Sequence, residues 1–254
     1  MTVTSVRRSQ KPGEKTMRLS HVLLPIVIVV AIGVSAASQG RPAAGRKDPE
    51  TRKKEVAAMR GAGGLKEAAA VTGHYRGTEA PYFEGDAKSL EELTEQALLV
   101  IVGAIQSNRS WLEASGKRIV TDYQVVVERG LKGHAKEGDV VTVSFPAGRV
   151  SFSDGSIAEM TMTGVPPPAN GQRFVFFLQR SHYAATPEQR AAARGPLYTP
   201  ALKSLGMFLL SPERGVVPRT PDHRHPIKTA YANVSEATFV DAIANASNQG
   251  GKGK

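Results

Sequence analysis

The sequence Asp222-His223-Arg224-His225 contains the residues whose types and spacing come closest to a metal site. Two histidines two positions apart can place both imidazoles on one side of an extended segment, where they could bind zinc together with Asp222 or a distant ligand. A closed zinc site needs four ligands, and the sequence offers no convincing fourth. We therefore favour an exposed polar loop between two prolines, and we expect neither a metal nor a cofactor.

Nucleophilic catalysis has no recognisable motif in this chain. The sequence contains no G-x-S-x-G pattern, and the absence of cysteine excludes thiolate chemistry, cysteine metal sites and disulfides. Four carboxylates, Asp122, Glu128, Asp139 and Glu159, fall on expected strand edges, where solubility explains them without acid or base chemistry. We expect no enzyme, and a metal or serine hydrolase of another type is the alternative.

Trp111 is the strongest candidate for contact with a partner. It is the only tryptophan of the chain and lies in the polar stretch "NRSWLEASGK", which we interpret as a loop between the first two strands. An exposed tryptophan can anchor a partner, because large aromatic side chains dominate the energetics of many interfaces. The alternative is a tryptophan that folds back over one end of the protein.

The stretch "TDYQVVVERGLKG" predicts one of the strands that must position these residues. Every second side chain from Ile119 to Val127 is expected to point inward, whereas the set from Val120 to Glu128 is expected to face water. The glycines at the end of the stretch and beyond allow a hairpin, after which Val141, Val143 and Phe145 resume the alternation.

Further elements follow from turn and capping signals. Ser89 and Glu92 have capping-box spacing and predict a short helix at about 90–96, followed by a buried central strand, "ALLVIVGAI". "QRFVFFLQR" predicts the most aromatic strand, with its phenylalanines in the core rather than stacked on bases. A short exposed helix is expected after Thr186, a last hairpin around 212–215, and a short C-terminal helix capped by Ser235.

Six or more short antiparallel strands with glycine turns predict a mainly β protein, either a sandwich or a small barrel, and we favour the barrel. The segments "ALLVIVGAI", "TDYQVVVERGLKG", "GDVVTVSFPAG" and "ANGQRFVFFLQR" resemble a pattern in exported bacterial proteins of unknown function. They are also similar to netrin-like modules and tissue inhibitors of metalloproteinases. This resemblance covers about residues 89–218 and implies an OB-like antiparallel β-barrel with a short N-terminal and a short C-terminal helix.

The resemblance stops short of the inhibitors' activity. Those inhibitors contact the protease metal through an N-terminal cysteine and brace the barrel with disulfides, and this chain has no cysteine. The fold is therefore expected to carry over and the inhibition is not.

The N-terminal region predicts export. "VLLPIVIVVAIGVSAA" follows Arg18 and ends in small residues, as in a secretory signal cleaved after Ala36, so residues 1–36 form a signal peptide or, alternatively, a retained membrane anchor. The expected location is periplasmic or extracellular, with membrane contact only through an uncleaved N-terminal segment. Translation could also begin at Met17.

The remaining boundaries follow from composition and charge. Residues 37–88 are rich in Gly, Ala and charge and predict a flexible basic tether, residues 89–247 form the barrel domain, and residues 248–254 form a flexible tail. Residues 1–60 hold 12 basic and 4 acidic side chains, whereas residues 61–247 hold 19 of each. The folded part is thus neutral, which argues against nucleic acid as its partner.

These observations predict an exported, non-enzymatic β-barrel module that binds a protein or an envelope component. A hydrolase without a familiar motif is one alternative. A barrel that binds single-stranded nucleic acid by stacking bases on aromatic side chains is the other.

Overall fold

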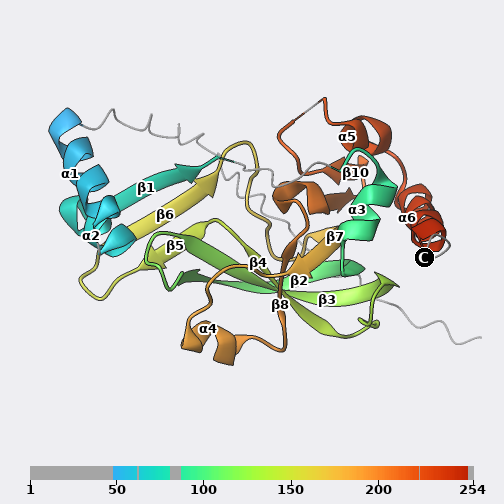
Figure 1. The fold of residues 1–254 in the computed structure, drawn as a ribbon, viewed down its shortest axis with the longest axis horizontal. Helices are drawn as coiled ribbons and strands as arrows, with labels where there is room; N and C mark the ends of the chain where they lie inside the picture. The colour runs from blue at the N-terminus through green and yellow to red at the C-terminus, as the bar shows by residue number, and fades with distance from the viewer. Residues whose placement is uncertain (1–47, 62, 81–86, 223, 251–254) are drawn as a thin grey trace, which may run out of the picture. The chain divides into compact units, whose positions relative to one another are not determined.

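The computed structural model describes residues 48–61, 63–80, 87–222 and 224–250 (Figure 1). The expected signal or anchor lies outside these residues. Among the residues described, no helix combines the length and the apolar character needed to cross a membrane.

A closed five-stranded antiparallel barrel forms the centre of the fold, as expected for an OB-like protein (Figure 1). The order around the barrel is β2-β3-β4-β8-β7, and β7 pairs with β2 to close it. Within this barrel, the β4–β8 pairing is parallel and the other pairings are antiparallel. The barrel strands are β2 (Leu99–Leu112), β3 (Ile119–Lys132), β4 (Val140–Phe145), β7 (Arg173–Arg180) and β8 (Leu197–Pro200).

The last hairpin is an extension of the barrel sheet. Strands β9 (Met207–Ser211) and β10 (Gly215–Pro218) form this hairpin, and β9 pairs with the first half of β7. The second half of β7 pairs with β8 instead. The hairpin predicted around 212–215 is therefore confirmed, and it lies beside the barrel rather than inside the closed ring.

The barrel interior is filled by alternate side chains of its strands. Val125, Phe174 and Phe176 are buried in this interior cluster together with side chains of β2 and β4. Gly103 allows β2 and β3 to approach closely, since a Cβ atom there would lie 2.6 Å from Val125 Cγ1. The β2–β3 register shifts between Val102 and Gly103, as it does at a β-bulge.

The other face of β2, β7 and β9 is covered by helices α3 (Leu90–Gln96), α5 (Pro226–Tyr231) and α6 (Glu236–Gly250). Phe177 points to this side. Its ring packs edge-on against Phe208 of β9 and Phe239 of α6, with centroid distances of 5.6 and 6.5 Å. The predicted C-terminal helix is confirmed, but it continues through residues 248–250, which had been assigned to the tail. The 3₁₀ helix η1 (Lys203–Gly206) connects β8 to β9.

Helix α3 confirms the capping box. The Glu92 backbone N–H donates to Ser89 Oγ at 3.3 Å, while Glu92 Oε2 accepts from the Lys88 N–H at 2.8 Å. At the other end, Lys132 Nζ of β3 donates to the carbonyls of Thr94 and Ala97 at 2.6 and 2.7 Å. The helix is thus held on the barrel by a cation at its C-terminus, where the helix dipole favours one.

Residues 48–79 are not a flexible tether, and that part of the prediction is wrong. They form helices α1 (Pro49–Arg60) and α2 (Gly64–Thr72) and strand β1 (His74–Glu79). Strand β1 pairs in parallel with β6 (Ile157–Met162), which also pairs with β5 (Gly148–Ser151) to give a separate three-stranded sheet. Leu65 of α2 is fully buried against Ile119 and Ala158, so this segment contributes to the core.

Candidate functional site

Trp111 lies in the last part of β2 rather than in a loop. Strand β2 continues to Leu112, and Trp111 pairs with Val120 of β3. Its side chain is half-buried, and the guanidinium carbon of Arg109 lies 4.0 Å from the ring centroid. Residues two apart in a strand share one face, which is why the arginine can lie over the indole.

A pocket of about 340 Å³ opens beside this pair and is called here the Trp111 pocket. Strands β2 and β3 supply most of the lining, and helix α4 (Pro187–Ala192) with the residues after it supplies the rest. Most of the lining residues carry polar or charged side chains, and Trp111 adds an apolar surface. It consists of Ser107, Asn108, Arg109, Trp111, Asp122, Gln124, Ala192 and Arg194.

Asp122 forms a buried carboxylate in the lining of this pocket, although its face of β3 was expected to be solvated. It is only 5% exposed. Ser144 Oγ donates to Asp122 Oδ1 at 2.6 Å, and Gln189 Nε2 donates to both carboxylate oxygens at 3.0 and 2.9 Å. Burial raises the pKa of Asp122 above its usual value, and the contacts with Ser144, Gln189 and Trp111 offset only part of this rise.

Helix α4 covers this end of β3. Thr186 caps the helix by accepting from the Gln189 N–H at 3.2 Å, as predicted, but the helix is not simply exposed. The Gln189 side chain is buried and is hydrogen-bonded to Asp122 across 67 residues of sequence. On the outward face of β3, the Asp122 side chain is therefore buried and the Gln124 side chain is half-buried.

Two arginines give the Trp111 pocket its charge. Arg109 and Arg194 are exposed, and neither forms an ion pair with a carboxylate among the residues that the structure describes. Arg109 lies opposite Asp122 in the β2–β3 pairing, but its guanidinium lies over Trp111. The donors of both arginines can therefore meet a ligand without first breaking an internal ion pair.

Two serines near acidic side chains are not placed as nucleophiles. Ser144 is fully buried and its hydroxyl donates to Asp122, so this serine cannot reach a substrate. Ser156 likewise donates to Asp154, at 2.7 Å. The pocket offers charge, hydrogen bonds and an aromatic face, all of which can bind a ligand.

Two of the weak metal candidates contact each other through the backbone, because the His225 N–H donates to the Asp222 carbonyl oxygen at 3.4 Å. Asp222 Oδ1 accepts from the Arg224 backbone N–H at 2.9 Å, and His225 precedes helix α5 as its buried N-cap residue rather than lying in an exposed loop. His223 lies outside the described residues. Within the described part of the chain, no three His, Asp or Glu side chains lie close enough together to hold a metal ion.

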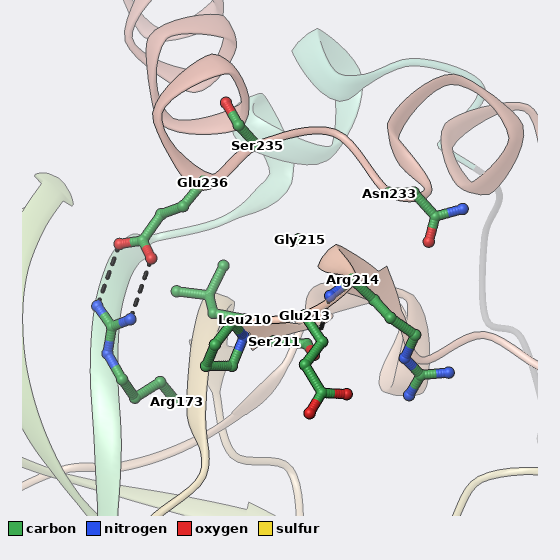
Figure 2. Close-up of a pocket in the computed structure, with 10 residues that line it drawn as sticks. Arg173, Leu210, Ser211, Glu213, Arg214, Gly215, Asn233, Ser235 and Glu236 are labelled. Atoms are coloured by element: carbon green, nitrogen blue, oxygen red, sulfur yellow. Dashed lines mark hydrogen bonds and ion pairs between the residues drawn. The ribbon is translucent and has the colours of Figure 1, made fainter.

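A larger pocket, of about 750 Å³, lies beside the β9–β10 hairpin and is called here the hairpin pocket (Figure 2). Arg173 is held there between two carboxylates. It donates to Glu128 at 2.6 Å and to Glu236 at 3.0 and 3.1 Å, and these bonds raise its pKa. Figure 2 shows the Arg173 and Glu236 pair at one side of the pocket and Arg214 at the other.

The Trp111 pocket is the better candidate despite its smaller volume. In the hairpin pocket, Arg173 of β7 already forms ion pairs with Glu128 and Glu236. The residues that line this pocket include no aromatic side chain. The hairpin pocket therefore contains a clamp that ties α6 to the barrel. Its exposed ion pairs contribute about 1 kcal/mol or less each, because solvent screens them.

No model of a known protein family matches this chain, and no curated protein matches it in sequence. The ligand must therefore be inferred from the chemistry of the pocket.

Proposed function

We propose that this protein is an exported, non-enzymatic binding module that holds a protein or an envelope component at the Trp111 pocket. The observation that carries the proposal is the combination of a half-buried tryptophan, a guanidinium stacked 4.0 Å above it and an open polar pocket beside them. A rigid β-sheet supplies Arg109 and Trp111, so the recognition surface is preorganised before a ligand arrives.

The alternatives find less support. For a hydrolase, Ser144, the serine beside the buried Asp122, is unsuited as a nucleophile because it is itself fully buried. Stacking of single-stranded nucleic acid on β7 is excluded for Phe174, Phe176 and Phe177, because all three are fully buried. The apolar stretch at 22–37 supports export, and the neutral charge balance of residues 61–247 supports a partner other than nucleic acid.

Trp111→Ala is expected to remove binding to the natural partner. Removal of a central tryptophan from an interface costs about 2 kcal/mol or more, which corresponds to a roughly thirtyfold loss of affinity. The measurement is affinity capture from the envelope fraction of the protein's own host, with quantification of each captured component. Thermal unfolding of the variant shows whether it is folded.

The matched control is Arg214→Ala in the hairpin pocket, which should capture the same component as the unmodified protein. Equal capture by the Trp111 and Arg214 variants would show that the partner binds elsewhere. If the unmodified protein reproducibly captured nothing, the binding function itself would be wrong.

A further inference from the structure

We propose that the group recognised in the Trp111 pocket is the carboxylate of an acidic sugar, presented by an envelope polysaccharide. This inference rests on the proposed function and adds the chemical class of the ligand. Two properties of the pocket carry it: two arginines without carboxylate partners among the described residues, and a lining that includes amide and hydroxyl groups.

The two arginines favour an anionic ligand. A guanidinium presents a planar set of N–H donors that matches a carboxylate, and charge-assisted bonds of this kind are about twice as strong as neutral ones. The Trp111 ring holds the Arg109 guanidinium from one side, so the donor edge is oriented in advance. Arg194, two residues after the end of α4, lines the same pocket.

The rest of the lining suits sugar hydroxyls better than apolar side chains. Ser107, Asn108 and Gln124 provide hydroxyl and amide groups, which can donate and accept hydrogen bonds, as sugar hydroxyls do. Asn108 Nδ2 already donates to Asn170 at 2.9 Å, a contact that orients this amide. Apart from Trp111, the lining contains one apolar residue, Ala192, so polar and charged side chains make up most of the lining.

The buried carboxylate discriminates among anions. Asp122 is held by Ser144 and Gln189, and its charge is repelled by any anion placed above it. A compact phosphate dianion suffers this repulsion more than a single carboxylate that is flanked by neutral hydroxyls. The volume of about 340 Å³ is at the lower end of the range for small-ligand sites, about 300–1,000 Å³, which suits one unit of a chain.

Titration of the full-length protein with trigalacturonate tests this proposal. Trp111 is the only tryptophan, so its fluorescence reports on the pocket, and calorimetry gives an independent affinity. Trigalacturonate should bind saturably and roughly tenfold or more tightly than neutral maltotriose, since hydrogen bonds to charged groups contribute about 1.5–3 kcal/mol. Pentaglutamate and inorganic phosphate should both bind more weakly than trigalacturonate.

Arg109→Gln and Arg194→Gln should each weaken binding of trigalacturonate by roughly tenfold, whereas Arg214→Gln, the matched control, should leave it unchanged. Arg109→Lys keeps the positive charge but loses the planar set of N–H donors. It should therefore bind trigalacturonate more tightly than Arg109→Gln and more weakly than the unmodified protein. Equal binding of maltotriose, or no response to trigalacturonate, would overturn the proposal. Tighter binding of pentaglutamate or phosphate at Trp111 would reject the acidic sugar while leaving the Trp111 pocket as the binding site.

Discussion

Val125→Asp is expected to abolish folding. Val125 is fully buried inside the barrel, where Phe174 and Phe176 belong to the same cluster. A carboxylate at this position would be shielded from solvent. Burial of an unpaired charge costs many kcal/mol unless the group is neutralised. That cost is comparable with the whole stability of a typical domain, about 5–15 kcal/mol, so the variant should lack a cooperative transition.

The control for this change is the neighbouring substitution Gln124→Asp. Gln124 points to the opposite face of β3, where it is half-buried and lines the open Trp111 pocket. This variant should keep the barrel and unfold cooperatively in urea, with near-ultraviolet circular dichroism close to that of the unmodified protein. If both variants unfolded alike, or if both were stable, the inward and outward sets of β3 side chains would be misassigned.

Leu65→Ala is expected to destabilise the protein by about 2–5 kcal/mol, the usual cost of truncating a buried leucine. Leu65 of α2 is fully buried and packs with Ile119, at the start of β3, and with Ala158 of β6. The effect is large because the substitution opens a cavity between the helix and both strands. Urea unfolding followed by circular dichroism measures it.

Val71→Ala provides a control on the same helix. Val71 is 41% exposed, so its truncation should cost less than about 0.5 kcal/mol, as at other surface positions. Equal, small effects at Leu65 and Val71 would mean that residues 48–79 are a tether after all. A difference between them would establish α2 as part of the folded core.

Local patterns were sufficient to predict the barrel strands β2, β3, β4 and β7, but not the four-residue strand β8. The Ser89 and Glu92 spacing located α3, since the cap is made within four residues. The alternation from Tyr123 to Val127 identified the inward side of β3 because burial on one face leaves a period of two.

Residues 48–79 were misassigned because their core contacts are few and distant. The segment is rich in alanine, glycine and charged residues, and Leu65 alone supplies a large buried aliphatic side chain in α2. Strand β1 is completed by parallel pairing of His74 with Ile157, far along the chain. A composition argument does not detect a segment whose partners are this remote.

The candidate site was predicted only in part. Trp111 was identified from its rarity and polar surroundings, yet its place on β2 was missed because the strand continues through the polar residues 107–111. An aspartate within an apolar, alternating strand is unusual, and Asp122 could have been suspected on that ground. Its partner Gln189 carries no such signal, because the contact is created by the fold.

Chemical-shift mapping with trigalacturonate tests most directly the central claim, that the Trp111 pocket binds the carboxylate of an acidic sugar. In nitrogen-15 spectra of the full-length protein, the predicted result is saturable shifts of backbone signals at 107–111 and 190–194, of the Trp111 indole N–H and of the Arg109 and Arg194 side-chain N–H groups. Signals around the hairpin pocket should stay in place. Shifts concentrated at the hairpin pocket, or no saturable shift beside Trp111, would contradict the claim.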